Sequence, residues 1–104
     1  MRRGEVWWAR LPAPAGRRPV VLLARDDAYP VRALVTVAPV TTRSRGIPVE
    51  VPLCQAEGLP KDCVANVDSV TTIAKSCLES RAGALATARI AALDRALKFA
   101  LGLA

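Results

Sequence analysis

Two short segments of the chain place arginines next to the ends of apolar runs. Gly16–Pro19 reads Gly-Arg-Arg-Pro, and Pro19 restricts the backbone from which Arg18 projects. Pro39–Gly46 follows another apolar run and combines three hydroxyl residues with two arginines. If the two runs form neighbouring strands, these segments converge on one surface. Each segment taken alone also fits a solvated loop.

Arginines beside hydroxyls suit one reaction of RNA, the attack of a 2′-hydroxyl on the adjacent phosphate. That reaction needs a proton acceptor for the attacking hydroxyl, a proton donor for the leaving oxygen, and stabilisation of the charge that develops on phosphorus. The chain contains no histidine, so arginine, hydroxyl and carboxylate groups would have to perform these steps. Loss of one preorganised donor costs ~10²–10³ in rate, so a single arginine can be decisive.

The charge balance of the whole chain favours a polyanionic partner. Fifteen basic residues against nine acidic ones give a net charge of +6 in 104 residues. Most of the bases are arginines, whose planar guanidinium matches phosphate oxygens in two-point contacts. Most of the excess charge lies in the first half of the chain, which predicts a nucleic-acid surface there. A basic surface that only aids solubility is the alternative interpretation.

The remaining composition excludes several classes. The three cysteines (Cys54, Cys63 and Cys77) form no Cys-x-x-Cys pair, which argues against a disulfide framework and a zinc site, so we expect buried reduced thiols. We expect no metal and no cofactor. No apolar stretch resembles a signal peptide or a membrane span, so the sequence predicts a cytoplasmic protein with no membrane partner.

Short β-prone runs separated by proline and glycine fill the first 85 residues. The length fits one domain spanning residues 1–104. The expected strands are Val6–Ala9, Pro19–Ala24, Ala33–Val40, Val49–Leu53 and Cys63–Asp68, with an extended piece near Ala82–Leu85. The second of these strands, Pro19–Ala24, is apolar throughout and should be buried on both faces. So many short strands predict a small curled sheet or barrel, because curling limits exposed edges.

A helical period appears only at the end of the chain. Ile90, Leu93, Leu97 and Leu101 recur at spacings of three and four from Thr87 onward. Thr87 or the turn before it would supply the N-cap, and Gly102 would end the helix. The sequence therefore predicts a β-rich α+β fold with a C-terminal amphipathic helix, whose apolar stripe packs on the sheet or on a second subunit.

Five motifs in a fixed order give the chain a resemblance to a known family. They are Arg3–Trp7, Arg18–Val20, Pro39–Thr42, Thr72–Lys75 and Leu93–Leu97. No single motif is specific, but together they resemble the MazF/PemK/Kid family of type II toxin–antitoxin endoribonucleases over essentially the whole length.

The resemblance implies an SH3-like barrel with a C-terminal helix that forms a homodimer. It also implies metal-independent cleavage of single-stranded mRNA at short motifs, leaving a 2′,3′-cyclic phosphate and a 5′-hydroxyl. The expected partner is a cognate antitoxin whose disordered acidic segment folds over the active groove.

The resemblance also implies site residues. The family's catalytic arginine falls on Arg18, which would stabilise the phosphorane, and its hydroxyl falls on Thr41, which would orient the scissile phosphate. The acidic position catalytic in some relatives falls on Asp68, although the arginine those relatives place two residues earlier is Asn66 here. The glutamate proposed as a base in many relatives is absent, so Asp68 is the first candidate proton acceptor and Glu50 the second.

Several further residues have two interpretations. An arginine common after the Thr-Ile-x-Lys motif is Cys77 here, so one contact of the family is in doubt. Trp7 and Trp8 must point to opposite faces of a strand, so at most one can pack in the core while the other stacks on a base or packs at a dimer contact. The residues expected to contact RNA, with solvated or structural roles as the alternative, are Arg17, Thr42, Arg43, Arg45 and Asn66.

Two other functions stay open at this point. A non-catalytic nucleic-acid-binding barrel would explain the charge and the strands. A toxin of the same fold that poisons DNA gyrase would explain the motifs without cleaving RNA.

Overall fold

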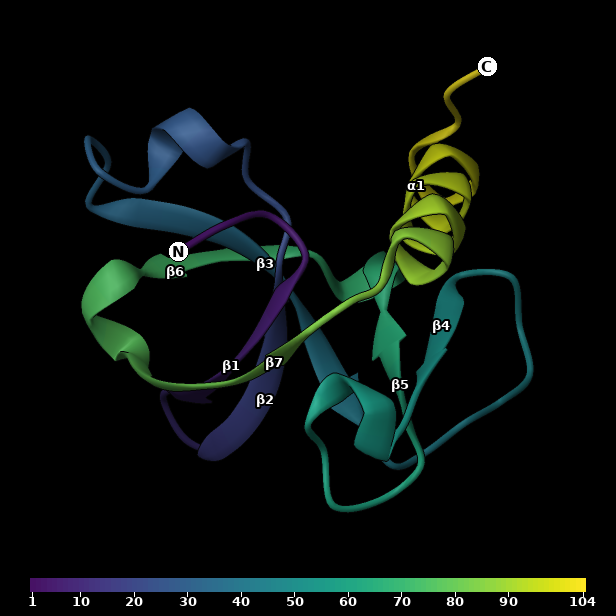
Figure 1. Cartoon of the computed structure of the whole chain (residues 1–104), viewed down its shortest axis with the longest axis horizontal. Coiled ribbons are helices and arrows are strands. Elements are labelled where there is room, and N and C mark those ends of the chain that lie inside the picture. The colour runs from purple at the N-terminus through teal and green to yellow at the C-terminus, as the bar shows by residue number, and fades with distance from the viewer.

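A computed structural model describes all residues from 1 to 104 as one curled antiparallel sheet with a single C-terminal α-helix (Figure 1). The strands are β1 Glu5–Arg10, β2 Arg17–Leu22, β3 Leu34–Thr41, β4 Glu50–Leu53, β5 Cys63–Asn66, β6 Thr71–Ala74 and β7 Leu78–Ala84, and the helix is α1 Thr87–Leu101. The predicted β-rich α+β class with a small curled sheet is confirmed.

Strand β3 holds the sheet together because it pairs with three other strands. The sheet order is β4-β5-β3-β2-β1-β7, and β6 also pairs with β3. The first half of β3 pairs with β6, from Leu34 opposite Ala74 to Val37 opposite Thr71. Its far end pairs with β5, where Thr41 lies opposite Val64. Because successive side chains of β3 point to opposite faces of the sheet, this strand contributes to two separate hydrophobic cores.

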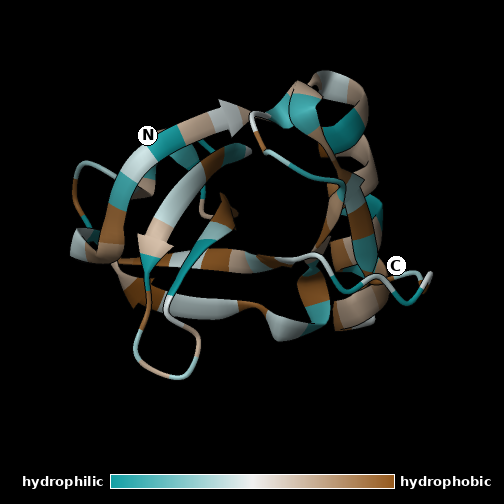
Figure 2. Cartoon of the chain, turned by 90° about the horizontal axis from the view of Figure 1, so that it is seen from below, coloured by the Kyte–Doolittle hydropathy of each residue, from teal (hydrophilic) through white to brown (hydrophobic).

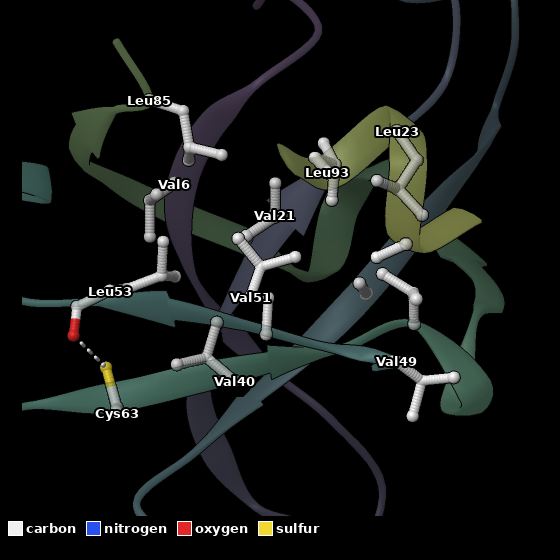
Figure 3. Close-up of a cluster of buried hydrophobic side chains, with 14 of the residues drawn as sticks. Val6, Val21, Leu23, Val40, Val49, Val51, Leu53, Cys63, Leu85 and Leu93 are labelled. Atoms are coloured by element: carbon white, nitrogen blue, oxygen red, sulfur yellow. Dashed lines mark hydrogen bonds between the residues drawn. The ribbon is translucent and has the colours of Figure 1, made fainter. Parts of the chain in front are cut away.

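The two cores lie on opposite faces of β2, as its apolar sequence predicts. Val20, Val21 and Leu22 are all fully buried. Val21 belongs to the larger cluster, which includes residues of β4 and β5 on the sheet and Leu93 of α1 (Figure 3). Val20 and Leu22 belong to a smaller cluster on the other face, with Tyr29 and Val35.

Helix α1 packs against β4 and against the 3₁₀-helix Val67–Ser69 that follows β5 (Figure 1). Leu93 is fully buried, and Ile90 and Leu97 pack against the same cluster. Leu101, the last member of the predicted stripe, is 61% exposed in the single chain, so the alternative of contact with a second subunit stays a prediction for it. Ala86 in the preceding turn is the N-cap and has no capping side chain, whereas Gly102 ends the helix in the left-handed conformation as predicted. The helix is too short and too polar to cross a bilayer.

Most strand boundaries differ from the prediction, those of the first five strands by one or two residues. Strand β2 is shifted two residues toward the N-terminus, and β3 is shifted by one residue toward the C-terminus. The fifth strand ends at Asn66, because Val67–Ser69 turns into a 3₁₀-helix. Strand β6 was not predicted, and β7 is longer than the expected Ala82–Leu85 piece. Figure 2 shows the mixture of hydrophobic and hydrophilic residues along the strands that makes such ends hard to place.

A close backbone crossing fixes β7 against the 3₁₀-helix Gln55–Glu57. Gly83 lies so near the backbone that an added Cβ would be 2.2 Å from the carbonyl oxygen of Glu57. A Cβ added to Gly58, whose φ is +87°, would lie 2.0 Å from the carbonyl oxygen of Ala82. Only glycine fits either side of this crossing.

All three cysteines are free thiols, as predicted. Cys63 is buried and donates to the carbonyl of Leu53 at 3.8 Å (Figure 3). Cys54 and Cys77 are only half-buried, so the expectation of burial holds for Cys63 alone.

Candidate functional site

Arg18 and Thr41 stand where β2 and β3 separate. The β2–β3 ladder sets Val20 opposite Pro39 and Val21 opposite Ala38. Continuing that register by two residues sets Arg18 opposite Thr41. The ladder itself ends at Val20 and Pro39, so Arg18 and Thr41 each lie two residues beyond its last pair. The two segments that the sequence singled out therefore begin at the same end of this ladder.

Arg18 has a positively charged group without an acidic partner. Its side chain is half-buried, and its Nε donates to the carbonyl of Ala15 at 3.4 Å. Five ion pairs hold other arginines, and none includes Arg18, Arg43 or Arg45. These three guanidinium groups are therefore available to an anion.

Thr41 is the last residue of β3, and its hydroxyl is part of a turn. Its Oγ1 accepts the backbone N–H of Arg43 at 3.2 Å. This contact bends the chain into an exposed arm, residues 42–48, which sweeps away from the sheet before β4 begins (Figure 1). Thr42, Arg43 and Arg45 all lie on this arm. The arm extends the positively charged surface beyond the end of β3.

Glu50 at the start of β4 holds the arm in place. Its carboxylate accepts the backbone N–H groups of Arg45 and Gly46, both at 2.9 Å, and the hydroxyl of Ser44 at 3.3 Å. Desolvation acts to raise the pKa of Glu50, but hydrogen bonds from the amides of Arg45, Gly46 and Ile47 and from Ser44 outweigh it, so the pKa is lowered. Glu50 is thus a structural brace and a weak proton acceptor.

Arg17 has a different environment from its neighbour Arg18. Its Nε donates to Glu79 at 3.0 Å, and its guanidinium lies 4.4 Å from the centre of the Trp8 ring. Glu79 also accepts from Arg10 at 3.0 Å. The hydrogen bonds from Arg17 and then Arg10 lower the pKa of Glu79. An RNA phosphate would therefore compete with Glu79 for Arg17.

Trp7 and Trp8 lie on opposite faces of β1, as predicted. Trp7 packs against the smaller cluster, and its Nε1 donates to Glu5 at 2.9 Å. Trp8 packs against the edge of the larger cluster and also lines a small pocket next to Thr41. Both indoles are half-buried, and Trp8 is the one that reaches the candidate site.

Asn66 and Asp68 lie at the other end of β5 from Thr41. Thr41 is opposite Val64, so Asn66 follows two residues later and Asp68 four residues later. The Asn66 side chain accepts the backbone N–H of Asp68 at 2.9 Å, and Asp68 is exposed on the 3₁₀-helix that contacts α1. Within one chain, the fold does not place Asp68 beside Arg18.

No group of three or more histidine, cysteine, aspartate or glutamate side chains is arranged to hold a metal ion. The site is made of guanidinium groups, hydroxyls, one indole and backbone amides.

Comparison with known proteins agrees with these motifs. A family model for PemK-like, MazF-like toxins of type II toxin–antitoxin systems matches residues 2–101. The chain belongs to this family.

Two relatives show how far this MazF-like chain matches. It is 43% identical over 100 residues to a Mycobacterium tuberculosis protein named probable endoribonuclease MazF5, covering 95% of this chain and 91% of that protein. It is 36% identical over 108 residues to the probable endoribonuclease MazF of Mycolicibacterium smegmatis, covering 100% of this chain and 99% of that protein. The similarity therefore extends across the whole chain.

Solved structures of the family have the same fold. The Mycobacterium tuberculosis toxin MazF-mt6 matches with a TM-score of 0.90 at 34% identity, covering 96% of this chain and 98% of that one. A mycobacterial endoribonuclease in complex with its cognate antitoxin matches with a TM-score of 0.89 at 28% identity, covering 100% and 97%.

Sequence reasoning missed three parts of the MazF-like site. Glu79 holds Arg17, Glu50 braces the arm, and Leu59 and Lys61 form part of the pocket beside Thr41. Glu79 and the pocket residues come from elements far along the chain from the motifs they serve. No local spacing could have indicated them.

Proposed function

We propose that this MazF-like chain is the toxin of a type II toxin–antitoxin system and cleaves single-stranded mRNA without a metal. The observation that supports it most is that Arg18 and Thr41 lie at the same end of the β2–β3 ladder, with Arg18 free of any acidic partner. Together with the endoribonuclease names of full-length relatives, this arrangement favours an enzyme over a passive binding surface.

The proposed reaction is internal transesterification. The 2′-oxygen forms a bond to the adjacent phosphorus while the bond from phosphorus to the 5′-oxygen breaks. The hydroxyl proton passes to an acceptor, and the leaving oxygen receives a proton. The products are a 2′,3′-cyclic phosphate and a 5′-hydroxyl, with no atom supplied from outside.

In this mechanism Arg18 donates to the phosphate oxygens on which charge develops, and Thr41 orients the phosphate. Donors that are already in place before the charge develops supply most of the rate acceleration in many enzymes. Arg17, Thr42, Arg43, Arg45 and Asn66 are proposed to contact the RNA. Asp68 is the proposed proton acceptor, and because the fold separates it from Arg18 within one chain, it would have to come from the second subunit of the proposed dimer. Asp68→Asn tests it: cleavage at an unchanged rate would remove that role.

The deciding experiment incubates the wild type and Arg18→Ala with a long single-stranded RNA in excess EDTA and maps the fragment ends. Cuts at a recurrent motif that carry cyclic phosphates, and that fall at least ~10²-fold in the variant, would support the proposal. Arg81→Ala is the matched control, because Arg81 pairs with Glu5 away from the site. A substrate with deoxyribose at the cut position should resist.

The same experiment separates the alternatives. Intact RNA with salt-sensitive binding would indicate a non-catalytic nucleic-acid-binding barrel. Intact mRNA with gyrase-dependent DNA damage in expressing cells would indicate a gyrase poison.

We further propose a cytoplasmic homodimer inhibited by a cognate antitoxin with an acidic segment. The exposed Arg43 and Arg45 suit such a segment, and a similar structure contains a cognate antitoxin. Phe99 and Leu101 on α1 leave apolar surface exposed, at 63% and 61%, which suits subunit contact. Sedimentation at two protein concentrations tests the dimer.

A further inference from the structure

A small pocket opens beside Thr41, on the Trp8 side of the sheet. It has a volume of about 120 Å³. Besides Thr41, its lining includes Trp8, Pro19, Leu59, Lys61 and Cys63. Leu59 is buried, whereas Lys61 is exposed. The pocket is thus mainly apolar, with one cationic donor among its lining residues, and it lies next to the proposed catalytic hydroxyl of Thr41.

The size and the apolar lining of this pocket suit one ring. An unstacked RNA base gains stabilisation when it packs against an aromatic side chain, and single-stranded RNA is recognised in this way. The volume is close to that of an apolar protein cavity of about 150 Å³ that holds one benzene ring, which favours a single ring over a fused pair. A pyrimidine therefore fits the pocket better than a purine.

The charges around the pocket favour the same ligand. The Lys61 ammonium has three donors and no acceptor, so it selects a base edge that presents carbonyl oxygens. Arg17 stacks on Trp8 without lining the pocket, which places a second positive charge beside it for the phosphate that follows the base. Uracil presents two carbonyl oxygens and no exocyclic amine.

We propose that the pocket formed by Trp8, Pro19, Thr41, Leu59, Lys61 and Cys63 binds one pyrimidine of the RNA, preferably uracil, next to the cut phosphate. This inference rests on the proposed ribonuclease function, and it names a determinant of the recognised sequence. Trp8 and Lys61 are then specificity residues, because they touch the base and not the reacting atoms.

Fluorescence tests binding separately from cleavage. The chain has two tryptophans, so Trp7→Phe leaves Trp8 as the only indole, and Trp8→Phe is its matched control with Trp7 alone. Eight-nucleotide oligomers of deoxyuridine and of deoxyadenosine serve as probes, because they lack the attacking hydroxyl. We expect the deoxyuridine oligomer to quench Trp8 with saturation and to bind about tenfold more tightly than the deoxyadenosine oligomer. Equal affinities, or quenching of Trp7 instead, would overturn the proposal.

Cleavage mapping supplies the second readout. Lys61→Ala should reduce the preference for uracil over adenine beside the cut by about tenfold, while Lys98→Ala on α1 should leave it unchanged. Unchanged cleavage preference in Lys61→Ala and Trp8→Phe would overturn the pocket and leave the ribonuclease standing. If the wild type cuts no RNA, the proposed ribonuclease fails, and the fluorescence affinities alone decide whether the pocket binds a pyrimidine.

Discussion

Both carboxylate oxygens of Glu50 accept the backbone N–H of Arg45, at 2.9 and 3.1 Å. The contact joins the first residue of β4 to the tip of the exposed arm, residues 42–48. It fixes the backbone that carries two of the arginines proposed to bind RNA.

Glu50→Ala should loosen the arm without unfolding the sheet. We expect kcat/KM for RNA cleavage to fall about ten- to a hundredfold, because small displacements of positioning groups are costly. Amide hydrogen exchange should show faster exchange at Arg45 and Gly46. Glu50→Gln, which keeps one accepting oxygen, should recover part of the protection. Unchanged exchange at both amides would show that the arm does not depend on this carboxylate.

Glu79→Gln should strengthen RNA binding by freeing Arg17. The neutral amide holds the two arginines less firmly, so Arg17 becomes available to a phosphate. We expect the slope of log affinity against log salt to steepen by up to about 0.7, the value for one added contact to a single strand. Glu5→Gln, which releases Arg81 instead, is the control. A shallower slope in Glu79→Gln would mean that Arg17 does not reach RNA.

Acid should destabilise the protein through Glu50 and Glu79. The pKa of each is lowered in the folded chain from an ordinary value of 4.5. The unfolded chain therefore takes up protons first, and the free energy of unfolding should fall as pH drops from about 5 through the lowered pKa values. Above pH 5 these two groups should not change the free energy of unfolding with pH. Urea titrations of the wild type and of a Glu50→Gln, Glu79→Gln variant from pH 3 to 7 measure the difference.

Gly83→Ala should be strongly destabilising. A Cβ there would lie 2.2 Å from a backbone oxygen, which cannot move aside as a flexible side chain can. We expect a loss of about 3 kcal/mol or more in the free energy of unfolding. Gly46→Ala is the control, since its added Cβ meets no atom within 4 Å and only its φ of +67° opposes it. Equal losses would mean that β7 and the Gln55–Glu57 turn do not cross so closely.

Replacing either of two leucines of α1 with alanine should change the free energy of unfolding by very different amounts. Leu93→Ala should cost about 2–5 kcal/mol, because the side chain is fully buried. Leu101→Ala should change the free energy of unfolding of the monomer by less than about 0.5 kcal/mol, because most of its surface is exposed. Denaturant unfolding at low protein concentration makes the comparison, and at higher concentration a loss in Leu101→Ala would indicate a role in the dimer.

The sequence predicted those parts of the fold that local pattern determines. The apolar run at Val20–Leu23 had to be buried on both faces, and the helix began at Thr87 as its period indicated. Strand β6 was missed because Thr71 and Thr72 are exposed and carry little apolar signal, and it is held by its ladder to β3. The period of a helix does not tell where the sheet beneath it ends, so it could not show that Leu101 is exposed in the single chain.

The candidate site was predicted only in part, for a similar reason. Proline and glycine punctuation indicated the two segments, and the family resemblance assigned Arg18 and Thr41 within them. Both residues lie just beyond the same end of the β2–β3 ladder, and their roles stay predictions. Glu79 lies 62 residues from Arg17, and the pocket joins β1, β2 and β3 to the segment at Leu59–Cys63. Such contacts depend on how the sheet curls, which no local pattern reports.

The three-way pairing of β3 has a consequence for how the protein opens. A strand that borders both cores cannot leave one without disturbing the other, so neither half of the sheet can unfold alone. The slowest-exchanging amides of β2, β3 and β5 should therefore report one cooperative unit with a single opening free energy. The arm, in contrast, should exchange at rates set by its own few hydrogen bonds, which lets a binding surface adapt while its support stays rigid.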